Sequence, residues 1–461
     1  MKIDLSSLHF EEAPKLVTEI PSPKSKEILK KQRLFEGNAV SYSRGIPVAF
    51  EEAKGATLKD VDGNIYIDFF GGAAVLGAGH CNPIILDAVK KQEEKLIHTL
   101  DLATEVREEL AEKLVKLAPG ELKDNAKVLF GGPTGSDAVE AAVKLAKYNT
   151  GAHVMISFEG GYHGMSGNAL ALTADTFFKK KYMPMGQPVH FAPYAYCYRC
   201  PFGLEYPDCD LACAKYLDHV LSDPASGICD VAGIIIEPIQ GEGGSIVPPD
   251  EFLVEIRKIT EEHSIPLITD EIQSGMGRTG KLFASEHAGI TPDIVTVSKA
   301  LGGGIGFPIS GVIYKKELDV WHPGAHIGTF RGFLPAMAAG IAYLEFLKEN
   351  NILEHVSNLG KYMLKRLKEL EEESKIVGEA RGRGLMLGVE LVYDEKTKKP
   401  APELAKELRI ECVKRGVIIE VGGHYHNVAR ILPPLVLTKE LADKGIDAFE
   451  AALKSIEHKL L

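Results

Sequence analysis

The segments LITDEIQSGMGRTG (267–280) and TPDIVTVSKALGGG (291–304) decide the fold class. Each contains a short run of apolar and β-branched residues that gives way to polar residues and glycine. Such a run predicts a strand that is buried on both faces, because a half-exposed strand would alternate apolar and polar residues. The first run ends at Asp270 and the second at Lys299. The sequence therefore predicts an acid and a lysine at the ends of two buried strands.

Similar apolar runs alternate with helical patterns along the middle of the chain. Buried strands that alternate with helices predict a mostly parallel sheet covered on both faces, which is the α/β class. A hairpin is expected earlier, at 55–72, with Asp62 and Gly63 in its turn. The predicted strands are 126–132, 153–158, 231–239, 265–272 and 293–299, and the helices between them include 136–149 and 252–263.

The pattern changes from about residue 345. A long charged helix is predicted at 350–374, and apolar runs follow at 384–392 and 416–421. We expect a smaller α+β domain that packs with the N-terminal segment. The predicted division is 1–80 for the N-terminal segment of the small domain, 81–344 for the large domain with a cysteine-rich insertion at about 194–215, and 345–461 for the C-terminal small domain.

Composition and charge exclude several classes of partner. The 461 residues include 53 Lys and Arg against 64 Asp and Glu, a net charge of −11 with no long basic block. This balance argues against nucleic-acid and anionic-membrane partners. No stretch approaches the roughly 20 apolar residues of a membrane span, and the N-terminus lacks an apolar signal core, so we expect a cytoplasmic protein. The scarcity of glutamine beside abundant lysine and glutamate suggests a thermophilic source.

Four of the seven cysteines cluster in the spacing C-x2-C-x8-C-x3-C. This spacing is compatible with a zinc or iron–sulfur site, with disulfides, or with free thiols. In each case we expect a local structural cluster in a loop-rich insertion and no metal at the catalytic centre. The four residues are Cys197, Cys200, Cys209 and Cys213.

Polar residues and glycines follow the predicted strands, at the edge where parallel sheets bind ligands. The segment 131–140 offers a helix N-terminus, which binds phosphate through free N–H groups. Tyr162 and His163 follow the next strand, and Glu237 and Glu242 follow another. Each feature alone has an ordinary reading as a turn, a cap or a solvated side chain. A phosphate cradle, an aromatic ring, an acid and a lysine together match the needs of pyridoxal phosphate.

These motifs resemble those of class III pyridoxal-phosphate-dependent aminotransferases of fold type I. The pattern of 267–280 followed by 291–312 is highly specific to that class. Supporting matches lie at 55–83, 158–164, 234–244, 328–332 and 429–440, and together they cover most of residues 40–440. The resemblance implies a large domain with a mostly parallel sheet between helices, and a smaller α+β domain built from the N- and C-terminal segments. It also implies a homodimer or a dimer of dimers with a shared active site.

The resemblance assigns roles to individual residues. Lys299 binds the cofactor's aldehyde and later moves a proton, and Asp270 pairs with the ring nitrogen; these two are the expected catalytic residues. The other cofactor-binding residues that it implies are Gly135 and Ser136 at the phosphate, Tyr162 on the ring with His163 beside it, Glu237, Gln273 at the ring hydroxyl, and Thr329 at the phosphate of the neighbouring subunit.

The same resemblance places four residues at the substrate. Arg430 matches the arginine that binds the carboxylate of the 2-oxo acid, and Glu242 matches the glutamate that neutralises it for the other substrate. Met165 stands where many ornithine-, acetylornithine- and 4-aminobutyrate-type members carry an arginine, and Ala73 stands at the ornithine-type tyrosine. The donor pocket must therefore be built differently, and the 2,4-diaminobutyrate-type branch is the nearer match.

The implied reaction moves an amino group from an ω-amino or diamino acid to a 2-oxo acid such as 2-oxoglutarate, by a ping-pong mechanism. The main alternative is an amino-acid racemase or epimerase, because archaeal members of the family have that activity. In those relatives the glutamate of the GEGG motif tends to be aspartate, whereas this chain keeps Glu242. A cofactor-binding protein without turnover is disfavoured by the intact set of Lys299, Asp270 and Tyr162.

Overall fold

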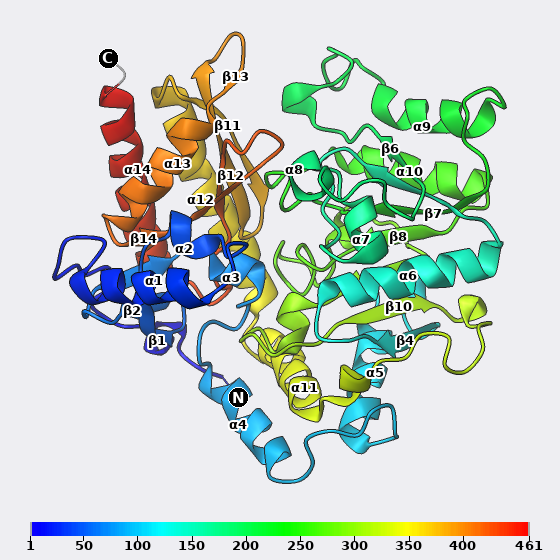
Figure 1. The fold of residues 1–461 in the computed structure, drawn as a ribbon, viewed down its shortest axis with the longest axis horizontal. Helices are drawn as coiled ribbons and strands as arrows, with labels where there is room; N and C mark the ends of the chain where they lie inside the picture. Colours follow the sequence, from blue (N-terminus) through cyan, green and yellow to red (C-terminus); the bar gives the residue numbers. More distant parts are fainter. Residues whose placement is uncertain (1, 460–461) are drawn as a thin grey trace.

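A seven-stranded sheet forms the centre of the larger part of the molecule (Figure 1). The computed structural model describes residues 2–459. The strand order is β4-β10-β9-β8-β7-β5-β6, and every neighbouring pair is parallel except the two that involve β10. The predicted mostly parallel α/β sheet is confirmed. The strands are β4 (Ala126–Phe130), β5 (Val154–Phe158), β6 (Val189–Ala192), β7 (Val231–Ile236), β8 (Leu267–Asp270), β9 (Ile294–Val297) and β10 (Gly311–Lys315).

Helices cover both faces of this sheet, and the side chains of β7 show why. Ile234 and Ile236 pack in one apolar cluster with Phe252 of α10, whereas Ile235 packs in another with Val139 of α6. Successive strand residues point to opposite faces, so a continuous apolar run needs cover on both sides. The helices of this part are α4 (Pro83–Glu93), α5 (Glu105–Leu117), α6 (Gly135–Thr150), α7 (Gly167–Leu172), α8 (Thr176–Lys179), α9 (Ala212–Ser222), α10 (Asp250–Glu262) and α11 (Leu334–Glu349).

The smaller part contains two further sheets, and one of them joins segments from the two ends of the chain. One has the order β1-β2-β3-β14, and the other has the order β11-β12-β16-β15 with β13 paired to β12. The apolar run at 416–421 divides between them, because β14 pairs with β3 and β15 pairs with β16. The strands are β1 (Phe50–Lys54), β2 (Thr57–Asp60), β3 (Ile65–Asp68), β11 (Val377–Arg383), β12 (Met386–Asp394), β13 (Lys399–Pro400), β14 (Val417–Ile418), β15 (Glu420–Gly422) and β16 (Val428–Ile431).

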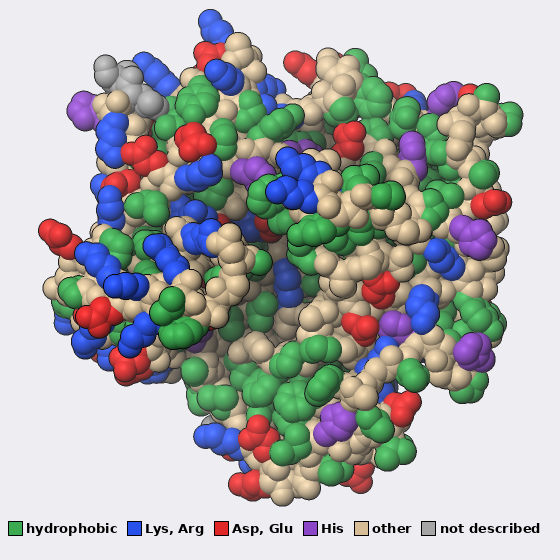
Figure 2. Space-filling model, viewed as in Figure 1, with side chains coloured by type: hydrophobic (Ala, Val, Ile, Leu, Met, Phe, Trp, Pro, Cys, Tyr) green, Lys and Arg blue, Asp and Glu red, His purple; other side chains and the backbone are tan. Residues whose placement is uncertain are grey.

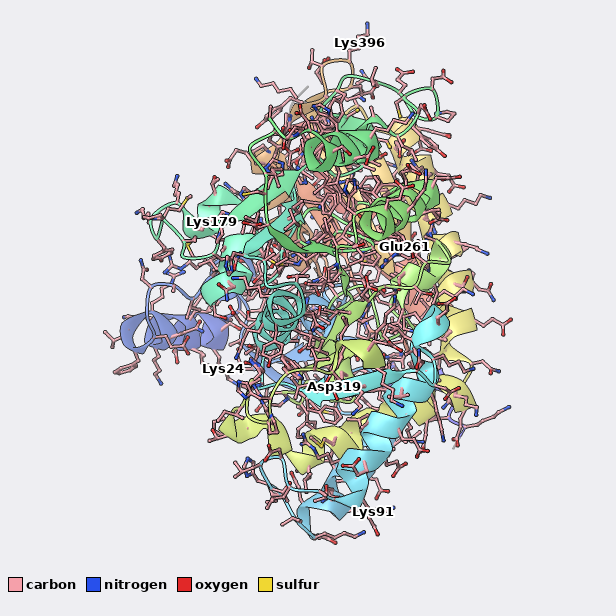
Figure 3. The ribbon with its side chains drawn as sticks, turned by 90° about the vertical axis from the view of Figure 1, so that its right-hand side faces the viewer. Lys24, Lys91, Lys179, Glu261, Asp319 and Lys396 are labelled. Carbon is pink, nitrogen blue, oxygen red and sulfur yellow. The ribbon has the colours of Figure 1, made fainter. Side chains whose placement is uncertain are left out.

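The helices of the smaller part include the long charged helix that the sequence predicts. In α12, Val356, Leu359, Met363 and Leu367 are buried at helical spacing, so one apolar stripe faces the core. The α1 helix lies on the viewed face in Figure 1 and projects from the body in Figure 3, where Lys24 is labelled. These helices are α1 (Pro23–Phe35), α2 (Tyr42–Gly45), α3 (Gly71–Ala74), α12 (Ile352–Glu373), α13 (Pro402–Val413) and α14 (Lys439–His458).

The predicted domain division at residues 80 and 344 stays a prediction. Within residues 2–459, none of the helices combines the length and the apolar character that crossing a membrane requires.

Candidate active site

One cavity of about 230 Å³ lies where β7, β8 and β9 end and α6 begins. Most of the residues that the sequence predicts for the cofactor line it. The surface is hollowed between the two parts of the molecule, as Figure 2 shows. The lining residues are Thr134, Gly135, Ser136, Tyr162, His163, Gly164, Glu237, Glu242, Asp270, Ile272, Gln273 and Lys299.

Lys299 lies at the first residue of a short 3-10 helix, Lys299–Gly302, directly after β9. Its φ of 47° is in the left-handed region, which costs a non-glycine residue about 1–3 kcal/mol. The turn around it is fixed, because the Ser298 hydroxyl donates to the Ile309 carbonyl at 2.8 Å. Burial lowers the pKa of Lys299 to about 8, while the charge of Glu242 acts in the opposite direction. The amine is therefore partly neutral near neutral pH and can act as a nucleophile.

Asp270 is held by three partners at the end of β8. Its Oδ1 accepts hydrogen bonds from the Thr296 hydroxyl at 2.9 Å and from the Ile272 N–H at 3.1 Å. Its Oδ2 lies 2.8 Å from Nδ1 of His163, which is also buried. These contacts fix the carboxylate at the cavity wall. The contact with His163 was not predicted, since the two residues are 107 positions apart.

Glu237 links two loops at the cavity. Its Oε1 accepts from the Tyr162 N–H and its Oε2 accepts from the Gly241 N–H, each at 2.9 Å. Burial raises the pKa of Glu237 to about 7, and the charge of Asp270 adds to that effect while His163 opposes it. Burial also raises the pKa of the Tyr162 phenol to about 12, so this ring is neutral. Glu237 therefore fixes the backbone that presents the Tyr162 ring.

The N-terminus of α6 and Gln273 supply polar groups without crowding the cavity. A side chain at Gly135 would come within 2.9 Å of Ile272, so glycine keeps the start of this 16-residue helix open. The first N–H groups of a helix have no partner within it and attract phosphate. Within the part of the chain described, Oε1 of Gln273 is buried without a hydrogen-bond partner. These groups fit a phosphate and a polar ring substituent.

Arg430 and Glu242 form an ion pair beside Lys299. Arg430 lies on β16 and is only 1% exposed, whereas the Glu242 side chain is 31% exposed and lines the cavity. Nη1 of Arg430 lies 2.8 Å from Oε2 of Glu242. Among residues 2–459, Nε of Arg430 has no hydrogen-bond partner. A buried guanidinium thus faces a partly exposed carboxylate.

Besides Arg430, three predicted residues lie outside the lining of this cavity. Thr329 is exposed at the start of the 3-10 helix Thr329–Gly332. Met165 is 48% exposed, and its N–H donates to the Ser136 hydroxyl at 3.2 Å. Ala73 lies in α3 with a φ of 58°. Their roles at cofactor and substrate stay predictions.

Thr134, Gly164 and Ile272 line the cavity and were missed. Each is next to a predicted residue in the chain, and that adjacency is the one signal that could have identified them.

The four cysteines of the insertion are free thiols in this structure. No cluster of three or more His, Cys, Asp or Glu within residues 2–459 is arranged to hold a metal ion.

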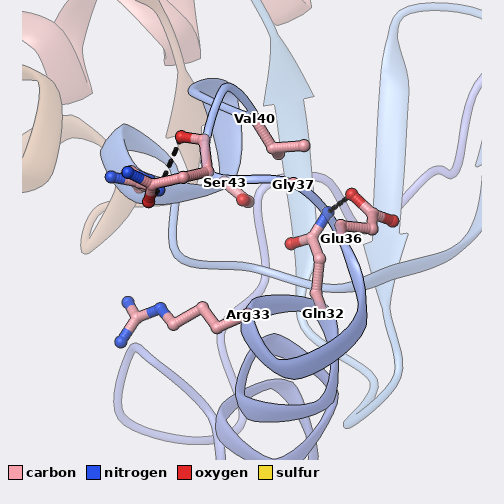
Figure 4. Close-up of a pocket in the computed structure, with 8 residues that line it drawn as sticks. Gln32, Arg33, Glu36, Gly37, Val40 and Ser43 are labelled. Carbon is pink, nitrogen blue, oxygen red and sulfur yellow. Dashed lines mark hydrogen bonds between the residues drawn. The ribbon is translucent and has the colours of Figure 1, made fainter.

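A second cavity, of about 470 Å³, lies between α1 and α2 (Figure 4). On the α1 side of it, Gln32 donates to Glu36 at 3.1 Å. Its lining contains none of the residues predicted for cofactor or substrate, so the cavity at Lys299 is the candidate active site.

The carboxyl edge of this mostly parallel sheet brings together a lysine, a buried aspartate, an aromatic ring and an open helix N-terminus. This arrangement defines a pyridoxal-phosphate site of fold type I. The model of the class III aminotransferase family matches residues 39–453, and the chain belongs to that family. Its members depend on pyridoxal phosphate, which confirms the predicted class and cofactor.

Two characterised relatives and one solved structure illustrate the similarity. The chain is 41% identical to the diaminobutyrate–2-oxoglutarate aminotransferase of Rhizobium meliloti (strain 1021), covering 94% of this chain and 93% of the relative. It is 38% identical to the leucine/methionine racemase of Thermococcus litoralis, covering 94% and 96%. The structure of a Bacillus anthracis aminotransferase superposes with a TM-score of 0.85 at 27% identity, covering 94% and 99%.

Proposed function

We propose that this enzyme transfers an amino group from an ω-amino or diamino acid to a 2-oxo acid such as 2-oxoglutarate, in two successive half-reactions at one site. The aminotransferase relative at 41% identity acts with diaminobutyrate and 2-oxoglutarate, and it covers nearly the whole chain. The observation that carries the proposal is the ion pair between Arg430 and Glu242 at the cavity.

This pair suits a site that must accept two unlike substrates. The guanidinium of Arg430 can bind a substrate carboxylate through two parallel hydrogen bonds, and the acceptor's carboxylate would displace Glu242 to do so. For a donor with a second amino group, Glu242 stays on Arg430 and keeps that buried charge neutralised. Because Arg430 is buried and Glu242 is partly exposed, Glu242 is the partner that moves.

The residues of the chain would divide the chemistry as follows. Bound pyridoxal phosphate would supply an electron sink for the carbon that loses its proton. Lys299, with its lowered pKa, would take that proton in its neutral form and return it at the next position. Asp270 would hold the proton on the ring nitrogen, as its fixed carboxylate at the cavity wall allows. Tyr162 would cover the ring, and the start of α6 would hold the phosphate.

Racemisation is the second candidate function, because the Thermococcus litoralis racemase is 38% identical over most of the chain. A racemase removes a proton from one face of the substrate carbon and adds a proton on the other face, so it needs no 2-oxo acid as amino acceptor. It therefore has no use for a carboxylate switch such as Glu242 on Arg430.

One experiment separates the two functions. The enzyme with pyridoxal phosphate is incubated with a panel of L- and D-amino acids and ω-amines, with and without 2-oxoglutarate, and products are resolved by chiral chromatography. We expect glutamate to form only when 2-oxoglutarate is present. Loss of optical purity without any oxo acid would instead establish a racemase.

We also propose a homodimer in which Thr329 reaches the phosphate at the second subunit's site. In support, Thr329 is exposed between two exposed apolar side chains, Ile327 at 73% and Phe330 at 68%. Large exposed apolar groups beside a polar contact residue are typical of an interface. Sedimentation should give twice the mass of the chain, and Thr329→Ala should weaken pyridoxal-phosphate binding without changing that mass. A monomer with unimpaired cofactor binding would contradict this.

A further inference from the structure

The loop that carries Glu242 is closed at its base within the larger part of the molecule. Gln240 and Ile246 form an antiparallel bridge, in which the two N–H to carbonyl distances are 3.1 and 3.0 Å. We call residues 241–245, which lie between them, the Glu242 loop. Because the two ends of this loop are joined, the position of Glu242 depends on the contacts that the loop makes farther along.

Two donors from the smaller part of the molecule hold the backbone of the Glu242 loop. The Gly423 N–H donates to the carbonyl of Glu242 at 2.9 Å. Nε of Arg381, on β11, donates to the carbonyl of Gly244 at 3.0 Å. Gly244 has a φ of 117°, and a side chain there would come within 3.1 Å of Nη2 of Arg381, so glycine lets the guanidinium approach. The backbone is therefore held at Glu242 itself and again two residues later.

Arg381 is itself anchored by a group of buried charges. Its side chain is 8% exposed, and its Nη1 lies 2.8 Å from Oε2 of Glu390, which is fully buried. The same Nη1 lies 2.5 Å from Oε2 of Glu379. Burial alone would raise the pKa of Glu390, but the charge of Arg381 and the hydroxyl of Tyr196 hold that pKa below its usual range. Glu390 therefore stays ionised and fixes the guanidinium that holds the loop.

The cysteine-rich insertion supplies two further members of this group. Tyr196 donates its hydroxyl to Glu390, and Nε of Arg199 donates to the other oxygen of that carboxylate at 2.5 Å. The Tyr196 hydroxyl also accepts a hydrogen bond from Nη2 of Arg381 at 3.3 Å. The insertion therefore helps to fix Arg381 and, through it, the Glu242 loop.

We propose that Arg381 is a positioning residue that sets how readily a substrate carboxylate displaces Glu242 from Arg430. This inference rests on the proposed function, in which the acceptor's carboxylate replaces Glu242 on Arg430 and the diamino donor leaves the pair intact. The two carboxylates compete for the same guanidinium. A loop with a fixed backbone keeps Glu242 close to Arg430 and so strengthens its side of that competition.

Loosening the Glu242 loop should therefore affect the two substrates in opposite directions. The acceptor's carboxylate would meet less competition and would bind more tightly. The diamino donor would lose the fixed carboxylate that neutralises Arg430, so its kcat/KM should fall. A residue that only stabilises the fold would, when replaced, weaken the use of both substrates. The opposite signs distinguish positioning from a general structural role.

The test uses Arg381→Lys in the full-length enzyme loaded with pyridoxal phosphate. Lysine keeps a positive charge for Glu390 but lacks the Nε–H that the Gly244 carbonyl accepts. Calorimetry measures the dissociation constant of glutarate, a dicarboxylate that lacks the oxo group and so does not react. We expect glutarate to bind about tenfold more tightly, the effect of one hydrogen bond that involves a charged group. In steady-state assays kcat/KM for 2,4-diaminobutyrate should fall.

The matched control is Arg383→Lys. Arg383 lies on the same strand and pairs with Asp250 at 2.8 Å, so this variant should leave both quantities unchanged. A double-mutant cycle tests the route, because in Glu242→Gln the further change Arg381→Lys should have no effect on glutarate binding. If Arg381→Lys does not fold, Glu390→Gln keeps the size of that side chain, weakens the anchor of Arg381 and should shift glutarate binding in the same direction.

Three results would overturn the inference. The first is an Arg381→Lys enzyme that binds glutarate as the parent does, and the second is one in which the use of both substrates weakens. The third is an effect on glutarate binding that persists in Glu242→Gln. A parent enzyme that forms no glutamate from 2-oxoglutarate would refute the proposed function, and this inference with it.

Discussion

The lowered pKa of Lys299 predicts how fast the enzyme takes up its cofactor at each pH. Only the neutral amine attacks an aldehyde. With the pKa at about 8 in place of 10.5, roughly 9% of the amine is neutral at pH 7 against roughly 0.03%, a gain of about 300-fold. We therefore expect the rate of cofactor attachment to rise about tenfold per pH unit below pH 8 and to level off above pH 9.

The assay mixes cofactor-free enzyme with pyridoxal phosphate and follows the absorbance near ~420 nm, a property of the bound cofactor. Lys299→Arg is the control, because arginine keeps the positive charge but does not form the bond. A second variant tests the cause of the shift. Glu242 is the largest charge effect raising the pKa of Lys299, so Glu242→Gln should move the midpoint to a lower pH.

Two results would refute the reasoning about Lys299. One is a midpoint near 10.5, which would mean that burial in the cavity does not destabilise the charged amine. The other is an absorbance change that survives in Lys299→Arg, which would place the bond at a different lysine.

The other predictions concern Lys299, Asp270 and Arg430. Lys299→Met should stabilise the cofactor-free enzyme by at most about 3 kcal/mol at pH 7, because the parent must bury an amine whose pKa is depressed. Between pH 8 and 10.5 the unfolded parent binds more protons than the folded parent, so the stability advantage of Lys299→Met should shrink as pH rises. Urea unfolding of both proteins at pH 7 and pH 10.5 measures it. A difference in unfolding free energy that stays constant with pH would contradict this reasoning. Asp270→Asn should lower kcat about 10²-fold or more in steady-state assays, since it removes the fixed charge at the ring nitrogen, and near-parental kcat would reject that role. Arg430→Lys should lower kcat/KM for 2-oxoglutarate about 10²-fold, because a lysine cannot bind a carboxylate bidentately. The value of kcat/KM for the amino donor should change much less. Equal losses for both substrates would argue for a purely structural arginine.

The sequence identified the strands that carry the site because their patterns are local. Buried parallel strands read as continuous apolar runs, and β4, β5, β7, β8 and β9 all lie within predicted segments. Neither β6 nor β10 was identified, and β10 is the one strand that runs against its neighbours in the large sheet.

What the sequence by itself determined about this protein is therefore its class, its cofactor and the residues at the strand ends, since Lys299 and Asp270 each follow a strong local signal. Only the tertiary structure decided which side chains meet. The buried pair of Arg430 with Glu242 and the contact of His163 with Asp270 join residues far apart in the chain. The division of 416–421 between two sheets was likewise set by packing. Such contacts depend on how whole elements pack, and no short stretch of sequence encodes that arrangement.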